Sequence, residues 1–216
     1  MTEVAIGTAT DPYQPAEGRY GLTRACIREL GMARTPFSLI TRGPMVRRDI
    51  DVLVDAARRA KVHVSFSVPT LDERIWRATE PGTAPPCRRL ETVRILTEAG
   101  IDTGVALAPI LPGLSDAPEL LADVVREARA AGASGIWANV LYLRPGTREH
   151  FLQALARDWP ELLPDYERLY AGRAYLPSSE VEPVRAAVRE LARSTWRPRR
   201  PPIRPAPQPE QLAFGV

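Results

Sequence analysis

Hydrophobic residues recur along the chain with two different periods, and together these predict strands that are each followed by a helix. In Val62–Val68, apolar and polar residues alternate with the period of two that is typical of a half-buried strand. Between residues 48 and 60, apolar residues instead recur at the three- and four-residue spacing of one helix face. The predicted strands are Glu3–Thr8, Phe37–Arg42, Val62–Val68, Thr103–Ala108 and Ile136–Leu143.

The predicted helices alternate with these strands. They cover about 22–30, 48–60, 87–99 and 117–131, a short one opens at the capping-box spacing Thr70–Glu73, and a last helical region begins near residue 148. Alternating strands and helices are the signature of βα units and a parallel sheet. An open doubly wound sheet competes with an incomplete barrel, but no Gly-x-Gly-x-x-Gly or Walker-type loop follows a strand. We therefore expect an α/β protein that is a partial (β/α) TIM-like barrel.

Length and composition predict one domain with an extension. At 216 residues the chain can bury one substantial core, which we expect over residues 1–196. Residues 197–216 are rich in proline and arginine, so we expect an extended, disordered tail that has no core to join.

Charge, cysteine content and hydropathy exclude several classes of function. A net charge of +3 is too small to be a nucleic-acid footprint by itself. The two cysteines, Cys26 and Cys87, are far apart and share no metal-ligand spacing, so no metal site is expected from them. No apolar run approaches the roughly 20 residues that span a bilayer, so no membrane contact is expected and the predicted location is cytoplasmic.

Small and polar residues on one face of the predicted strands indicate a ligand cavity. His63, Ser65 and Ser67 share a face of the third strand, opposite its apolar face. The fourth strand leaves room on one face at Ala106 and Ala108, and Asn139 lies within an otherwise apolar strand. Two alternatives stay open, because the serines could face solvent and His63 could be a hydrogen-bonded structural residue.

Polar groups also follow the strands, where the loops of parallel sheets build ligand sites. Thr8, Asp11 and Tyr13 follow the first strand, Arg42 follows the second, and Pro109 follows the fourth. Arginine can bind a carboxylate bidentately, but Arg42 could equally form a salt bridge at the rim. Asp-Pro is also common turn chemistry.

Two motifs are specific enough to suggest a family. They are Ile6–Glu17 (IGTATDPYQPAE) and Ala108–Asp116 (APILPGLSD), and they are supported by Ile40–Gly43 (ITRG), Val64–Val68 (VSFSV) and Leu141–Gly146 (LYLRPG). In order, and from about Glu3 to Tyr175, the chain resembles the radical S-adenosylmethionine proteins related to spore photoproduct lyase.

The resemblance implies a six-stranded partial barrel, of which the five units here would be strands two to six. It implies S-adenosylmethionine as a cofactor, together with a 4Fe–4S cluster that cleaves it to a substrate-activating radical. It also implies cofactor-binding residues, namely Thr8 and Asp11 near the methionine moiety, Arg42 facing the carboxylate, Ser65 and Ser67 on the lumen wall, and Ala108 and Pro109 by the adenine. Tyr13, after the first strand, and Asn139, within the last, complete the set of candidate cofactor-binding residues.

The sequence departs from the family in one severe respect. The Cys-x3-Cys-x2-Cys loop that holds the cluster is absent, and Cys26 and Cys87 cannot replace it because three thiolates must reach one small inorganic core. Our first interpretation is a fragment of a radical enzyme, inactive as it stands, with an exposed apolar strand edge near Val4–Thr8. The alternative is a non-catalytic barrel that binds a nucleoside or S-adenosylmethionine.

Two partner predictions remain. The family resemblance makes DNA or another nucleic acid a candidate partner, for repair or modification. The C-terminal residues Gln211, Leu212 and Phe214 resemble the short peptides that dock on bacterial sliding clamps, although so short a match favours a disordered terminus with chance apolar residues.

Overall fold

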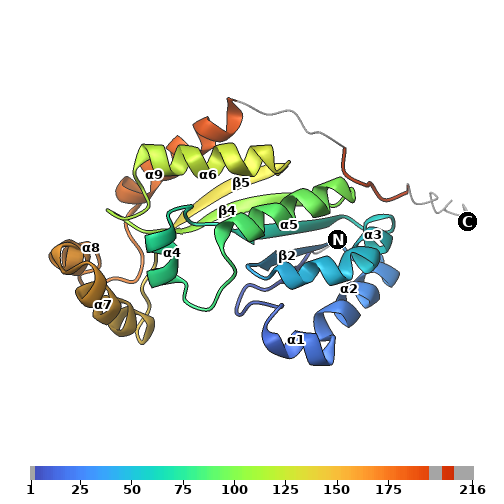
Figure 1. Cartoon of the computed structure of the whole chain (residues 1–216), viewed down its shortest axis with the longest axis horizontal. Helices are drawn as coiled ribbons and strands as arrows, with labels where there is room; N and C mark the ends of the chain where they lie inside the picture. Colours follow the sequence, from blue (N-terminus) through green and yellow to red (C-terminus); the bar gives the residue numbers. More distant parts are fainter. Residues whose placement is uncertain (1–2, 195–200, 207–216) are drawn as a thin grey trace, which may run out of the picture.

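Five parallel strands lie side by side in one sheet, in the order in which they occur along the chain (Figure 1). The structure is a computed structural model, and it describes residues 3–194 and 201–206. The sequential order is that of a (β/α) barrel, whereas a doubly wound sheet reverses its order. The predicted α/β class and parallel sheet are therefore confirmed, and the strand order is consistent with the predicted partial barrel. The strands are β1 (Val4–Ile6), β2 (Phe37–Thr41), β3 (Val62–Ser67), β4 (Asp102–Ile110) and β5 (Gly135–Val140).

Helices connect successive strands and continue after β5. They are α1 (Pro15–Tyr20), α2 (Leu22–Met32), α3 (Ile50–Ala57), α4 (Glu73–Thr79), α5 (Pro86–Glu98), α6 (Pro118–Ala130), α7 (Thr147–Asp158), α8 (Leu163–Leu169) and α9 (Ser178–Arg193), with 3-10 turns η1 (Pro44–Asp49) and η2 (Pro160–Leu162).

The predicted helices are present, with two local differences. The helix expected over 48–60 begins as the 3-10 turn η1, because Pro44 and the loop from β2 set its first turn. The helix expected to open at Thr70 begins at Glu73, because Asp72 is the residue that caps it and accepts the Ile75 backbone N–H at 2.9 Å. The Thr70 hydroxyl instead accepts the Asp72 backbone N–H, within the preceding turn.

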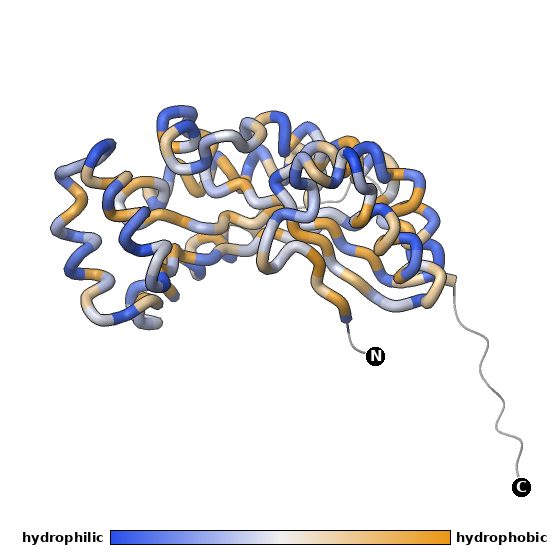
Figure 2. The backbone as a smooth tube through the Cα atoms, turned by 90° about the horizontal axis from the view of Figure 1, so that it is seen from below, coloured by the Kyte–Doolittle hydropathy of each residue, from blue (hydrophilic) through white to orange (hydrophobic). Residues whose placement is uncertain are grey.

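The alternation in β3 separates the core from the opposite face of the sheet. Val64, Phe66 and Val68 are fully buried and belong to one apolar cluster with Leu53 of α3 and Leu96 of α5. Figure 2 shows helices gathered on one side of the strands. The large side chains therefore face the helices, and the small and polar ones line the other face of the sheet.

A second apolar cluster fixes the loops after β4 and β5. Leu111 and Leu143, from those loops, pack with Leu155 of α7 and with Tyr166 and Tyr170. The Tyr166 hydroxyl donates to the Pro112 carbonyl at 2.8 Å, and the Tyr170 hydroxyl donates to the Leu141 carbonyl at 2.6 Å. The helices α7 and α8 thereby hold the segments that follow the strand ends.

The two edges of the sheet differ in how far other elements cover them. α9 packs against β5 and buries Val188 in the main core. Within the described residues β1 pairs only with β2, and Val4 remains 38% exposed. The predicted exposed apolar edge is thus confirmed. Among the described residues, no helix has the length and apolar character that a bilayer crossing needs.

Part of the proline-rich tail packs on the domain. The Ile203 backbone N–H donates to the Gly100 carbonyl at 2.8 Å, and the Ile203 side chain packs, partly buried, on the main core. A Cβ at Gly100 would come within 3.0 Å of Ile203, so the glycine leaves the space that this side chain uses. The prediction that the tail has no core to join is therefore wrong for residues 201–206. Gln211, Leu212 and Phe214 lie outside the described residues.

Replacing Ile203 by alanine should lower the free energy of unfolding by about 1–2 kcal/mol. Fully buried isoleucines lose about 2–5 kcal/mol on this change, and Ile203 is only partly buried. Urea denaturation measures the effect, and the exposed neighbour Arg204→Ala serves as the control that should change nothing. Equal unfolding midpoints for Ile203→Ala and the wild type would show that the segment does not pack on the domain.

Candidate functional site

A cavity of about 440 Å³ lies at the carboxyl ends of the strands. Every strand contributes to it directly or through the loop that follows, as parallel sheets require for a shared site. The lining comprises Gly7, Thr8, Ala9, Thr10 and Asp11 after β1, Ile40, Thr41 and Arg42 at β2, Ser67 of β3, Ala106, Ala108 and Pro109 of β4, Trp137 and Asn139 of β5, and Leu141, Tyr142 and Thr147 beyond it.

Most of the predicted cofactor-binding residues meet in this cavity. Those that line it are Thr8, Asp11, Arg42, Ser67, Ala108, Pro109 and Asn139. The two that do not are Tyr13 and Ser65. Ser65 lies on the same face of β3 as Ser67, but it is buried and its hydroxyl has no hydrogen-bond partner.

Asp11 shapes the cavity by tying the first loop to the end of β2. One carboxylate oxygen accepts the Tyr13 backbone N–H at 2.8 Å and the Thr41 hydroxyl at 2.7 Å. The other oxygen accepts the Arg42 backbone N–H at 2.7 Å. The Asp11 side chain therefore fixes the Asp-Pro turn to the end of β2, and its carboxylate already accepts hydrogen bonds from several donors.

Arg42 forms a salt bridge at the rim of the cavity, which is one of the two roles that the sequence allowed for it. Its Nε donates to Glu80 Oε1 at 2.6 Å, while its side chain remains 38% exposed. The other oxygen of Glu80 lies 2.9 Å from Nη2 of Arg89, whose side chain is fully buried. Burial lowers the pKa of Arg89, although the Glu80 charge opposes this. Both terminal nitrogens of Arg42 lack a partner within the described part of the chain.

Tyr13 belongs to a buried network away from the cavity. Its hydroxyl donates to Asp49 Oδ2 at 3.0 Å, and Asp49 also accepts from Arg48 at 2.8 Å and from Arg24 at 3.1 Å. Burial and the Asp49 charge raise the pKa of Tyr13. The hydroxyl of Tyr13, which we predicted to face a ligand, is therefore already bound to a buried carboxylate outside the cavity.

Sequence reasoning missed the aromatic part of the lining. Trp137 is 42% exposed, and Tyr142 is 43% exposed, and both line the cavity. Trp137 precedes Asn139 by two positions, so the alternation of β5 places both on one face. That signal was present in the sequence. For His63, the structure supports the structural alternative, because its Nδ1 lies 2.9 Å from Asp102 Oδ2.

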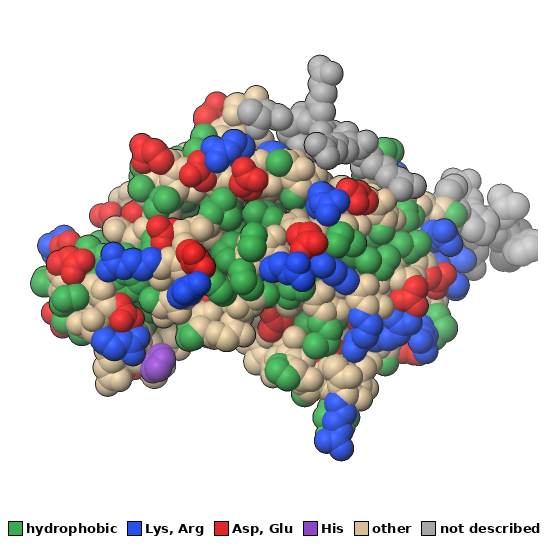
Figure 3. Space-filling view, in the orientation of Figure 1, with side chains coloured by type: hydrophobic (Ala, Val, Ile, Leu, Met, Phe, Trp, Pro, Cys, Tyr) green, Lys and Arg blue, Asp and Glu red, His purple; other side chains and the backbone are tan. Residues whose placement is uncertain are grey.

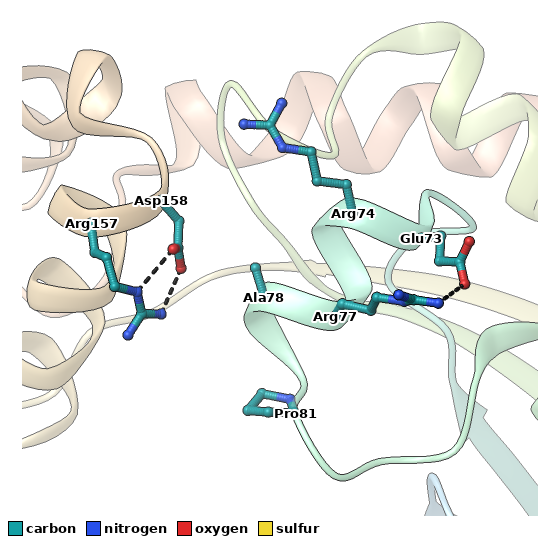
Figure 4. Close-up of a pocket in the computed structure, with 7 residues that line it drawn as sticks. All are labelled: Glu73, Arg74, Arg77, Ala78, Pro81, Arg157 and Asp158. Atoms are coloured by element: carbon teal, nitrogen blue, oxygen red, sulfur yellow. Dashed lines mark hydrogen bonds and ion pairs between the residues drawn. The ribbon is translucent and has the colours of Figure 1, made fainter.

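A larger open groove, of about 740 Å³, lies between α4 and α7 (Figure 4). Four of its five charged side chains pair with one another, since Arg77 bonds Glu73 and Arg157 bonds Asp158. The fifth, Arg74, lies over the ring of Trp159. It receives no residue from a strand end. Basic and acidic groups are interspersed over the face in Figure 3, which gives this groove no strong field of one sign. The strand-end cavity is therefore the better candidate site.

The described part of the chain holds no group of side chains that suits iron or another metal. Cys26 and Cys87 are both exposed and unpaired, and they lie on different helices, α2 and α5. Within residues 3–194 and 201–206, no group of three histidine, cysteine or carboxylate side chains could hold a metal ion.

Comparison with known proteins identifies a family. The sequence profile of the Radical SAM superfamily matches residues 2–125. An uncharacterized protein of Mycobacterium tuberculosis is 42% identical over 188 residues, which cover 87% of this chain and 55% of that protein. The chain thus spans about half the length of this curated relative.

Solved structures of spore photoproduct lyase share the fold. A point mutant of that enzyme gives a TM-score of 0.65 at 16% identity, covering 88% of this chain and 57% of the lyase. A second mutant, solved with bound AdoMet and dinucleoside spore photoproduct, gives a TM-score of 0.63 at 17% identity over the same shares of the two chains. At these identities the likeness concerns the fold alone.

The buried Asp49 network predicts a loss of stability in acid. Burial alone would raise the pKa of Asp49, but hydrogen bonds from Arg48, Arg24 and Tyr13 outweigh it and lower that pKa. The carboxylate therefore stabilises the fold above its unfolded pKa of about 4, and the contribution is lost as pH falls toward the lower folded pKa. Asp49→Asn should lose about 3 kcal/mol at pH 7, because it removes the fully buried anion that the partly exposed side chains of Arg24 and Arg48 contact.

Urea unfolding at pH 7 and at successively lower pH measures this effect. The difference between Asp49→Asn and the wild type should shrink as pH falls below the unfolded pKa. Asp51→Asn is the matched control, because Asp51 also pairs with Arg24 but its side chain is 64% exposed, and it should cost far less. A pH-independent difference for Asp49→Asn would contradict the assignment.

Proposed function

This chain belongs to the Radical SAM superfamily, and from that premise we propose that its strand-end cavity binds S-adenosylmethionine. The observation that carries the proposal is the meeting of the family-like motifs at one cavity. Thr8 and Asp11, from the first motif, and Ala108 and Pro109, from the second, line it together. A volume of about 440 Å³ lies within the roughly 300–1,000 Å³ range of small-molecule sites.

The chemistry of the lining fits the parts of this cofactor. The small side chains of Ala106 and Ala108 leave space for a ligand along the lumen wall. The exposed Trp137 offers an aromatic surface for an adenine ring. Because only Nε of Arg42 is engaged by Glu80, its terminal nitrogens remain available for a carboxylate. Thr8 adds a hydroxyl to the lining. These residues would bind and orient the cofactor.

The 4Fe–4S cluster of the family does not fit this sequence. Bound at its own ligands, the cluster would supply the electron that cleaves S-adenosylmethionine, but two distant cysteines cannot hold it. We therefore derive no radical step for these residues alone. We propose that β1–β5 correspond to strands two to six of the family barrel, and that the cluster ligands of a working enzyme lie outside these 216 residues.

A non-catalytic binding protein is the alternative, and the absence of a cysteine motif from this sequence favours it.

A nucleic acid is a candidate substrate or ligand, because structures of the lyase include a dinucleoside photoproduct. The exposed Trp137 and Tyr142 support a substrate with aromatic rings. The net charge of +3 supports a single nucleotide unit better than a long duplex.

Calorimetric titration with S-adenosylhomocysteine, a stable analogue of the cofactor, should show saturable one-to-one binding. Ala106→Trp should weaken it at least tenfold, because the indole fills a lumen position that is now small. Asn139→Ala adds no bulk, and it should weaken binding about two- to tenfold, as one lost hydrogen bond predicts.

The control for these variants is Arg157→Ala, which lies in the other groove and should bind as the wild type does. Circular dichroism verifies that each variant is folded. Absence of binding by the folded wild type, or full binding by Ala106→Trp, would refute the assignment of the cavity.

Anaerobic reconstitution with iron and sulfide should leave only substoichiometric iron on this chain after desalting. The physical reason is the wide separation of Cys26 and Cys87 on two helices. Iron analysis and visible absorbance provide the measurement, with the double variant Cys26→Ser/Cys87→Ser as the control. One complete cluster per wild-type chain, lost in the double variant, would overturn the ligand argument.

A further inference from the structure

A second chamber, of about 210 Å³, adjoins the strand-end cavity. The two share Asn139, Leu141 and Tyr142 as a common wall. The far wall of the second chamber comes from Tyr175 and from α9, including Arg185. At roughly 30 Å³ per water molecule, its volume suits one substituted ring and not a base pair.

The walls of this chamber lie in a different part of the chain from the family motifs. The superfamily profile ends at residue 125, whereas every residue that lines the chamber lies between Asn139 and Arg185. The strand-end cavity also uses residues from Gly7 to Pro109, inside the matched part. The residues that bind the common cofactor are expected within the part of the chain that matches the superfamily. A chamber formed by residues outside that part is better suited to the substrate, which differs between members of the superfamily.

The positively charged guanidinium of Arg185 bonds a neutral amide. Its Nη2 donates to Asn139 Oδ1 at 2.5 Å, and its Nε is buried with no hydrogen-bond partner. No carboxylate pairs with it among the residues described. Glu182 also lines the chamber, but it is already bonded to Arg189. A half-buried guanidinium without a counter-ion favours an anion in the adjoining space.

The same contact fixes which way the Asn139 amide points. A guanidinium has donors only, so the Asn139 atom that it meets must be the carbonyl oxygen. The amide nitrogen of Asn139 has no partner in the described part of the chain. The wall between the two chambers therefore presents N–H donors, and a ligand there must supply an acceptor.

An aromatic and basic rim completes the chamber. The rings of Tyr142 and Tyr175 stack with centroids 5.2 Å apart and an angle of 20° between them. Tyr175 is 55% exposed, and Arg144 bonds its hydroxyl at 2.7 Å. Exposed tyrosines beside guanidinium groups are surfaces on which a planar ring stacks.

We propose that the second chamber is the substrate side of the site and binds an aromatic ring that carries an oxyanion. The oxyanion meets Arg185, the ring stacks at Tyr175, and Asn139 separates this ligand from the cofactor. This inference rests on the proposed function, because the ligand of the second chamber is a substrate only if the strand-end cavity binds the cofactor. The predicted contacts with the ligand come from these residues and do not need the cofactor.

The test compares three probes by calorimetric titration of the whole chain. Thymidine 5′-monophosphate carries ring and oxyanion, thymidine carries the ring alone, and inorganic phosphate carries the anion alone. The monophosphate should bind at least tenfold more tightly than either partial probe. Indole-3-acetate then distinguishes the source of the anion, since binding of this probe as well would extend the site to aromatic carboxylates.

Variants assign the contacts. Arg185→Gln should weaken the monophosphate at least tenfold and leave thymidine almost unchanged, and Arg185→Lys should retain part of the affinity. Tyr175→Ala should weaken the monophosphate and thymidine alike. Arg193→Gln, at the exposed end of α9, is the control that should change neither. Equal affinity of the wild type for the monophosphate and thymidine, or an unaltered Arg185→Gln, would overturn the proposal.

A parallel titration with S-adenosylhomocysteine separates this inference from the function on which it rests. Binding of the analogue without the monophosphate overturns the second chamber and leaves the cofactor proposal intact. Binding of the monophosphate without the analogue supports the chamber and removes the cofactor proposal. If the folded chain binds neither ligand, both are wrong.

Discussion

One carboxylate, that of Glu80, joins the parts of the chain that form the rim of the candidate site. It lies between Arg42, at the end of β2, and Arg89, whose side chain is fully buried in α5. Arg89 in turn donates to the Ser67 carbonyl at the end of β3 at 2.8 Å. A buried guanidinium needs such partners, because an uncompensated charge in the interior is costly. The chain after α4, two strand ends and α5 are thereby fixed against one another.

The parallel order of the strands then determines what the cavity contains. All five carboxyl ends lie at one edge, so the loops after β1, β2 and β4 converge without any need for proximity in sequence. The period of two places large side chains toward the helices and leaves Ser67, Ala106 and Asn139 on the lumen face. Those two rules suffice to predict the fold class, the strands and about half of the cavity lining from the sequence, because both act within a strand or at its end.

These two rules could not predict contacts between residues that are far apart in the sequence. Tyr13 follows β1 as a ligand-facing residue would, but its hydroxyl is bound by Asp49 from η1. Ile203 lies in a proline-rich tail, yet Gly100 leaves it a space on the core. Arg185 meets Asn139 across 46 positions of sequence. None of these contacts has a local signal, since each depends on how elements pack after they form.

The most direct test of the account is a crystal structure of this chain with S-adenosylhomocysteine and thymidine 5′-monophosphate. The account predicts the analogue in the strand-end cavity, in contact with Ala108 and Asn139. It predicts the monophosphate beyond Asn139, with its oxyanion at Arg185. Either ligand in the groove between α4 and α7, or an Asn139 side chain that turns its oxygen away from Arg185, would contradict it.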